Sequence, residues 1–140
     1  MNRPADELPY LDEHSIRIAA SRERVWTALQ DYAATSLRIP DRSPLAGLLG
    51  TEPRAGFDVA ERAPLERLTL VGRHRFARYL LTFELTDAGA AATQLRAQSY
   101  AEFPGVGGRL YRALVIGSRA HVVATNHILR SVRRLTLASA

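Results

Sequence analysis

Two histidines carry most of the chemistry that this sequence could perform. His121 falls in the centre of an apolar helical stripe, between the small residues Gly117 and Ala124, which leave space beside an imidazole. His74 continues the inward face of a predicted strand. If both side chains point inward, two titratable groups share one cavity, as an acid–base site requires. The alternatives are a buried His121 that hydrogen-bonds a strand carbonyl or hydroxyl, and a solvent-facing His74 at the end of its strand.

Aromatic residues at inward strand positions are the candidates for a cavity wall. Tyr79 and Phe83 alternate on one strand face, and the Tyr79 hydroxyl could orient the polar end of a ligand. The alternative is that these rings, with Trp26 and Tyr32, are ordinary core residues. The residues predicted to line a ligand site are Tyr79, Leu81, Phe83, Leu114, Gly117, His121, His74 and Phe103, and the candidates for catalysis are His121 and His74.

Composition excludes several kinds of site. The chain has no cysteine, and all 19 of its Lys and Arg residues are arginine, which rules out thiolate catalysis, cysteine metal sites, lysine Schiff bases and a Walker lysine. His121 and His127 lie about 240° apart around a helix, so they cannot bind one metal ion as an i, i+4 pair does. The sequence contains no Gly-x-Ser-x-Gly motif. We therefore expect no metal and no cofactor.

A particular set of elements must bring the candidate residues together. Period-two alternation predicts strands, and apolar residues at helical spacing predict helices. Strands are predicted at residues 14–20, 57–61, 66–75, 79–86 and 93–103, with turns at 76–78 and 87–89; helices are predicted at 22–33 and 109–135, with short helical pieces at 35–49. The glycines of FPGVGG, at 103–108, are predicted to shape a turn and a close approach of helix to sheet. This order indicates an α+β fold, with a curved antiparallel sheet wrapped around one long C-terminal helix.

The length of 140 residues fits one domain, which we place at residues 13–137 after a flexible leader at 1–12. No run of about 18 apolar residues predicts a membrane span, and the polar start is unlike a signal peptide, so we expect a cytoplasmic protein. The net charge of +5 includes Arg112, Arg119, Arg130 and Arg134, predicted to lie on the solvent side of the last helix. Because no aromatic residues are interleaved with them, they do not predict nucleic-acid binding.

Two segments of the sequence resemble a known superfamily. IAASRERVWTALQDYA follows the first strand, and RLTLVGRHRFARYLLTFEL is followed by a hairpin and TQLRAQSYAEFPGVGGRLYRALVIGSRAH. With the order of elements, they resemble an uncharacterised branch of the START/SRPBCC superfamily, over residues 16–135. The resemblance implies the helix-grip fold and an interior cavity, between the sheet and the last helix, that receives an apolar small molecule.

The resemblance leaves more than one function open, because a single scaffold can serve carriers, receptors and enzymes. The first is a domain, monomeric or homodimeric, that binds an apolar ligand of lipid-, aromatic- or polyketide-like type. The second is an enzyme of the polyketide cyclase or aromatase type that uses His121, with His74 and Tyr79, for acid–base chemistry. A third class is a module that recognises partners through an apolar or arginine-rich surface.

Overall fold

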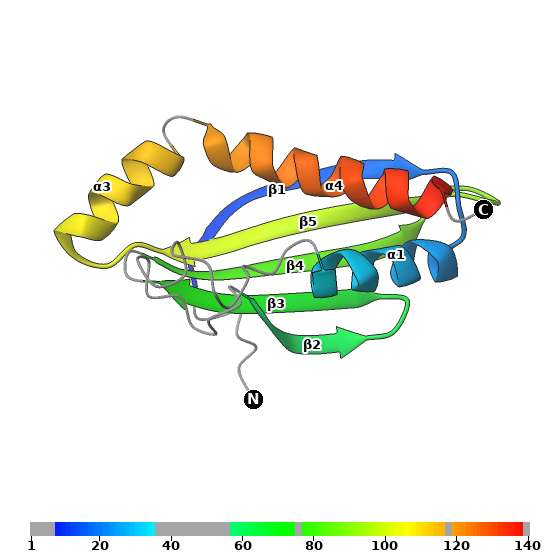
Figure 1. Cartoon of the computed structure of the whole chain (residues 1–140), viewed down its shortest axis with the longest axis horizontal. Coiled ribbons are helices and arrows are strands. Elements are labelled where there is room, and N and C mark those ends of the chain that lie inside the picture. The colour runs from blue at the N-terminus through cyan, green and yellow to red at the C-terminus, as the bar shows by residue number, and fades with distance from the viewer. Residues whose placement is uncertain (1–7, 36–56, 75–76, 117–118, 139–140) are drawn as a thin grey trace.

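The computed structural model describes residues 8–35, 57–74, 77–116 and 119–138, and within these ranges the chain forms one antiparallel sheet and three helices (Figure 1). The elements in chain order are β1 (Tyr10–Ile18), α1 (Arg22–Thr35), β2 (Asp58–Ala63), β3 (Arg67–His74), β4 (Ala77–Asp87), β5 (Thr93–Glu102), α3 (Gly105–Val115) and α4 (Ala120–Ala138). The strand order is β1-β5-β4-β3-β2, and every pair is antiparallel. The predicted α+β class is therefore confirmed.

Helices α1 and α4 lie on one face of the sheet, which we call the inner face (Figure 1). Helix α4 contacts α1, β1 and β5, and α1 also contacts β4. Along each strand, inner-face residues alternate with outward-facing ones, as the pleat requires. Phe83 of β4, for example, lies opposite Ala97 of β5 and Leu68 of β3, and all three are buried. The inner face is thus the surface that any interior site must share with α4.

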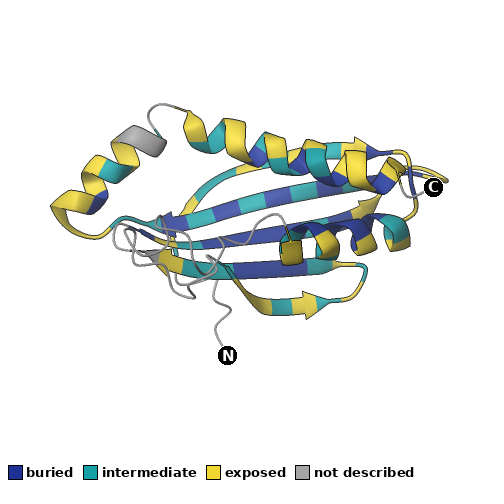
Figure 2. Ribbon diagram, viewed as in Figure 1, coloured by how far each residue is buried: buried dark blue, intermediate teal, exposed yellow. Residues whose placement is uncertain are grey.

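The hydrophobic core occupies the part of the inner face under α1 and the later turns of α4 (Figure 2). The helices contribute Val25, Leu29, Leu129 and Val132, each at most 1% exposed. Full burial of a side chain of this size stabilises a fold by about 1.5–3 kcal/mol relative to its exposure. These contacts fix α1 and α4 against the sheet at one end of the molecule.

The single long helix predicted at 109–135 is wrong. Helix α3 begins at Gly105 and ends at Val115, and α4 begins at Ala120. Arg119 has a φ of 66°, a left-handed conformation that an α-helix cannot contain, so the helix is interrupted before α4. Apolar spacing alone could not reveal the interruption, because two short helices with apolar residues on both sides of a break can imitate one long stripe.

The apolar stripe predicted for the last helix is confirmed only in part. Val132 is buried, and His121 and Ile128 are half-buried, whereas Leu110, Ala124 and Leu135, also placed on the stripe, are exposed. The other buried residues of α4 are Thr125, Leu129 and Thr136. Thr125 Oγ1 donates to the His121 carbonyl oxygen at 2.9 Å, and Thr136 Oγ1 donates to the Val132 carbonyl oxygen at 2.7 Å. Because the helix backbone satisfies both hydroxyls, threonine can occupy the buried side that apolar spacing assigns to other residues.

Two strands differ from their predicted bounds. β1 begins at Tyr10, four residues before the predicted start, so Tyr10 to Asp12 are strand residues and not part of a leader. A register shift between Tyr10 and Asp12 interrupts the alternation there, which hides the strand from a period-two pattern. β4 begins at Ala77, inside the predicted turn at 76–78. The helical pieces predicted at 35–49 lie outside the described residues, apart from Thr35 at the end of α1.

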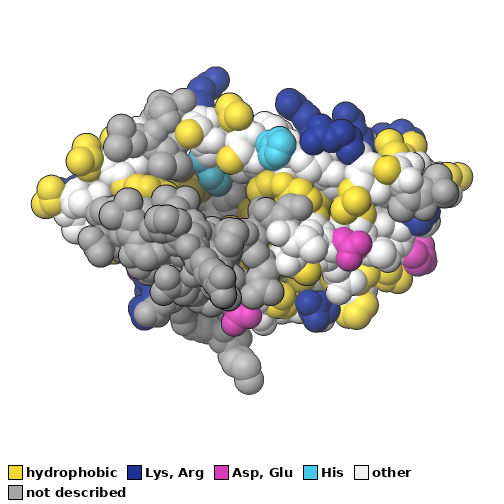
Figure 3. Space-filling model, viewed as in Figure 1, with side chains coloured by type: hydrophobic (Ala, Val, Ile, Leu, Met, Phe, Trp, Pro, Cys, Tyr) yellow, Lys and Arg dark blue, Asp and Glu magenta, His cyan; other side chains and the backbone are white. Residues whose placement is uncertain are grey.

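The FPGVGG segment forms the predicted turn, but its close approach is to the preceding backbone and not to the sheet. Gly105 has a left-handed φ of 70°, and a Cβ at Gly108 would lie 2.5 Å from the Phe103 carbonyl carbon, so only glycine fits this close approach. The predicted solvent side of the last helix is also confirmed, since Arg112, Arg119 and the later arginines of α4 are exposed (Figure 3). None of the helices that the structure describes is long and apolar enough to cross a bilayer.

Candidate functional site

The inner face changes character towards the end of the sheet where β1 begins. Asp12 of β1 lies opposite Ser99 of β5, in a row that continues through the core residues Leu81 of β4 and Leu70 of β3. In the next row, Tyr79 of β4 lies between Ala101 of β5 and Gly72 of β3. Polar and small side chains thus enter the inner face first on β1 and β5, beside core residues of the neighbouring strands. We call this region the polar half of the inner face; it comprises Asp12, His14, Gly72, Tyr79, Ser99 and Ala101.

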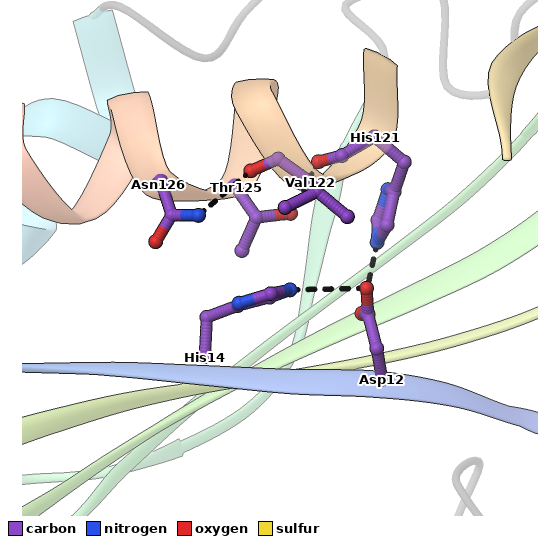
Figure 4. Close-up of polar contacts among 6 residues, drawn as sticks. All are labelled: Asp12, His14, His121, Val122, Thr125 and Asn126. Carbon is purple, nitrogen blue, oxygen red and sulfur yellow. Dashed lines mark hydrogen bonds and ion pairs between the residues drawn. The ribbon is translucent and has the colours of Figure 1, made fainter. Parts of the chain in front are cut away.

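Asp12 joins β1 to the start of α4. Its Oδ1 accepts a hydrogen bond from His121 Nε2 at 3.0 Å, and its Oδ2 accepts one from His14 Nε2 at 3.1 Å (Figure 4). The side chains of His121, His14 and Asp12 are 22%, 23% and 27% exposed. His121 belongs to the first turn of α4, which has no acidic residue of its own, so Asp12 also supplies the negative charge that a helix N-terminus favours.

Local sequence explains why these side chains meet. Asp12 and His14 are two residues apart in one strand, so they project from the same face of the sheet. His121 is directed towards them because it lies four residues before the buried Thr125, on the same face of α4 (Figure 4). We call Asp12, His14 and His121 the Asp–His cluster.

The hydrogen bonds of the Asp–His cluster determine where each imidazole can act as a base. An ionised carboxylate only accepts hydrogen bonds, so both imidazoles donate to Asp12 through Nε2–H. A neutral imidazole then keeps its lone pair on Nδ1. Neither Nδ1 has a hydrogen-bond partner among the described residues. The cluster can therefore accept a proton or a hydrogen bond from a bound molecule at His14 or His121.

Ser99 is a buried polar residue whose hydroxyl has no partner. Its side chain lies on the inner face opposite Asp12, the residue is 4% exposed, and Oγ makes no hydrogen bond among the described residues. By contrast Thr93, on the same face of β5, donates from Oγ1 to the Ala20 carbonyl oxygen at 2.8 Å. An unmade hydrogen bond at a buried group costs about 1–3 kcal/mol. Ser99 Oγ is therefore available to any molecule that enters the polar half.

Tyr79 closes the polar half on the side of β3. Its ring packs edge-on against Phe57, with the centroids 5.1 Å apart. Burial, and to a lesser extent the neighbouring Tyr111, raises the pKa of Tyr79 to about 12. The hydroxyl therefore stays protonated near neutral pH. Tyr111 of α3 in turn packs on Phe103, with a centroid separation of 6.2 Å, so these aromatic residues connect α3 to the sheet.

The structure places some of the predicted site residues together and separates others. Tyr79 lies in the polar half and His121 faces it, whereas Leu81 and Phe83 are members of the packed core. Phe103 contacts Tyr111 and lies beneath the Arg112 guanidinium, 5.9 Å from its ring centre. Three predicted residues cannot be placed: Gly117 lies outside the described residues, and the side chains of His74 and Leu114 are not among those described.

Sequence reasoning missed three residues of this site: Asp12, His14 and Ser99. Asp12 and His14 form an Asp-x-His pair, a spacing that places both side chains on one strand face, but the predicted leader ended at residue 12 and removed Asp12 from the strand. Ser99 stands at an inward-facing position of the predicted strand 93–103, so the same alternation could have placed it on the inner face. The pairing with His121 could not be predicted, because it joins residues 109 positions apart.

Comparison with known proteins identifies the architecture. No protein-family model matches the sequence, and no curated protein is significantly similar to it. A START superfamily protein from Mycobacterium smegmatis aligns with a TM-score of 0.56 and 13% identity, over 94% of this chain and 99% of that chain. The protein has the START-type fold. The resemblance found in the sequence is therefore confirmed for the fold.

Other proteins share the START-type fold with this chain. A conserved protein from Geobacillus kaustophilus aligns with a TM-score of 0.61 and 16% identity, over 91% of this chain and 95% of that chain. The di-domain ARO/CYC StfQ from the steffimycin biosynthetic pathway aligns with a TM-score of 0.58 and 13% identity, over 91% of this chain and 50% of that chain. The likeness therefore covers most of this chain.

Proposed function

We propose that this protein binds an apolar small molecule, of lipid-, aromatic- or polyketide-like type, between the inner face of the sheet and helix α4. The observation that carries the proposal is the buried Ser99 hydroxyl, which has no hydrogen-bond partner among the described residues and lies between Asp12 of β1 and Leu81 of β4. Polar groups in protein interiors are rarely left without a hydrogen bond, and exceptions point to a missing partner. A bound molecule would supply that partner.

The composition of the polar half supports a space for a ligand. Gly72 and Ala101 flank Tyr79 in one row, where the equivalent core row places Leu68 and Ala97 on either side of Phe83. Small apolar residues with a few convergent polar groups are typical of ligand sites. The solved structures with a START-type fold include ARO/CYC proteins of biosynthetic pathways, which agrees with a small-molecule ligand.

Filling the polar half should abolish binding. In Ala101→Phe a large ring replaces a methyl group on the inner face, and the affinity for an apolar fluorescent probe dye should fall at least about tenfold. Thr86→Phe adds the same ring at an exposed position of β4 and should leave the affinity unchanged. Unchanged dye affinity in a folded Ala101→Phe protein would contradict the proposal. Native mass spectrometry of freshly purified protein would show directly whether a small molecule co-purifies.

The second candidate function is an enzyme of the polyketide cyclase or aromatase type, and the Asp–His cluster favours it. His121 would act as the base through Nδ1, with Asp12 fixing its tautomer, and Tyr79 and His74 would assist as predicted from the sequence. His121→Phe should abolish turnover of a poly-β-carbonyl substrate while ligand affinity changes less than about threefold. An equal loss of turnover and affinity would favour a binding protein.

A further inference from the structure

The Asp–His cluster and Ser99 together offer mainly hydrogen-bond acceptors. Asp12 contributes its carboxylate, and His14 and His121 each contribute an Nδ1 lone pair. Ser99 Oγ contributes one donor together with acceptor capacity. With neutral imidazoles, the only formal charge of this group is the negative charge of Asp12. A ligand matched to it has a hydrogen-bond donor and no negative charge.

No described arginine forms an ion pair or a hydrogen bond with Asp12, His14, His121 or Ser99. The arginines with ion pairs lie elsewhere: Arg22 with Asp87, Arg67 with Glu61 and Glu84, Arg78 with Glu102, and Arg96 with Glu13. Arg24 donates to the Thr136 carbonyl near the C-terminal end of α4, far along the helix from His121. A carboxylate group bound beside the Asp–His cluster would be repelled by the like charge of Asp12.

We infer that the ligand is a neutral molecule with a hydroxyl group on an apolar body, an alcohol or a phenol. Its oxygen accepts a hydrogen bond from Ser99 Oγ, and its O–H donates to an imidazole of the Asp–His cluster. This inference rests on the proposed function and adds the chemical class of the ligand. It also gives Asp12 a role as a positioning residue, because the carboxylate keeps the imidazole lone pairs on Nδ1.

Three matched probes test the inference: 2-naphthol, 2-methylnaphthalene and 2-naphthoate, which share one ring system and differ in the polar group. All three titrations are made in the same buffer. We expect 2-naphthol to bind most tightly and 2-naphthoate most weakly. Ser99→Ala should weaken 2-naphthol by about 2- to 10-fold, the value of one hydrogen bond, and leave 2-methylnaphthalene unchanged. The control Ser15→Ala, at an exposed position of β1, should change neither.

The outcomes separate the two proposals. If none of the probes binds, the proposed function fails and the inference fails with it. If the probes bind but 2-naphthol has no advantage over 2-methylnaphthalene, or 2-naphthoate binds most tightly, only the inference is overturned. An equal loss of affinity for both neutral probes in Ser99→Ala would likewise overturn the inference. The hydroxyl would then shape the cavity without forming a hydrogen bond to the ligand.

An optical readout tests the acceptor. Excited 2-naphthol is a strong acid, so its O–H bond breaks, the proton forms an N–H bond at a neighbouring base, and the molecule emits as naphtholate. We expect a naphtholate band from the bound probe and a reduced band in His14→Phe or His121→Phe. If both folded variants keep the full band, the imidazoles are not the acceptors and the assignment is wrong.

Discussion

Removing the Ser99 hydroxyl should stabilise the ligand-free protein, although most substitutions in a core destabilise. Ser99 is 4% exposed and its Oγ has no hydrogen-bond partner among the described residues. Leaving such a group buried without a hydrogen bond costs about 1–3 kcal/mol. Ser99→Ala removes that cost and loses only the van der Waals contacts of one oxygen atom. We expect the free energy of unfolding to rise by about 1 kcal/mol, which corresponds to roughly 3–5 °C in Tm for a domain of this size.

Thr93 provides a matched contrast on the same face of β5. Its Oγ1 donates to the Ala20 carbonyl at 2.8 Å, and the residue is fully buried. Thr93→Val keeps the shape of the side chain but leaves that carbonyl unsatisfied, so it should destabilise by about 1–3 kcal/mol. Urea unfolding of both variants, followed by circular dichroism, gives the two changes on one scale.

A destabilised Ser99→Ala protein would refute this reasoning. If the two variants lose similar stability, the Ser99 hydroxyl is hydrogen-bonded in solution and cannot be a vacant anchor for a ligand. If Ser99→Ala gains stability, the wild-type residue is retained at a cost to folding, which is typical of positions that serve binding.

Three further predictions concern other parts of the fold. Because the pKa of Tyr79 is raised to about 12 from 10.0, stability should fall as pH rises above 10.0, and urea unfolding should show a smaller fall in Tyr79→Phe. Arg24→Gln removes a 2.8 Å hydrogen bond to the Thr136 carbonyl and should cost about 1 kcal/mol in thermal unfolding; no change would mean that the contact contributes nothing in solution. Gly108→Ala forces a Cβ to within 2.5 Å of backbone and should lower Tm by several degrees more than Gly107→Ala, at an exposed position; equal shifts would contradict the close approach.

The sheet was the most predictable part of the structure. The hairpin between β4 and β5 follows from alternation on both sides of the loop after Asp87, and the observed register pairs Asp87 with Thr93 across a loop of residues 88–92. α1 was equally clear, because Val25, Leu29 and Tyr32 repeat at helical spacing and are all buried. These signals are local, so a sequence contains them without knowledge of the partner elements.

The site was less predictable because it depends on contacts between distant segments. His121 remains a candidate, and its partner Asp12 lies in a strand whose register shift disrupts the alternation. The interruption before α4 could not be recognised either, since Arg119 reaches a left-handed φ without being glycine or asparagine. The sequence prediction failed at the two places where the periodic pattern is interrupted, the register shift in β1 and the break before α4.

The strand order has a consequence for how the chain folds. β1 precedes the other strands in the chain, yet it pairs with β5, the last of them. β1 therefore cannot pair until β2, β3, β4 and β5 have been synthesised. β2 to β5 form a meander of neighbouring antiparallel pairs that can assemble early, because each closes only a short loop. Docking of β1, which brings Asp12 and His14 to β5, is therefore a late step of folding, and the Asp–His cluster forms only when the sheet is otherwise complete.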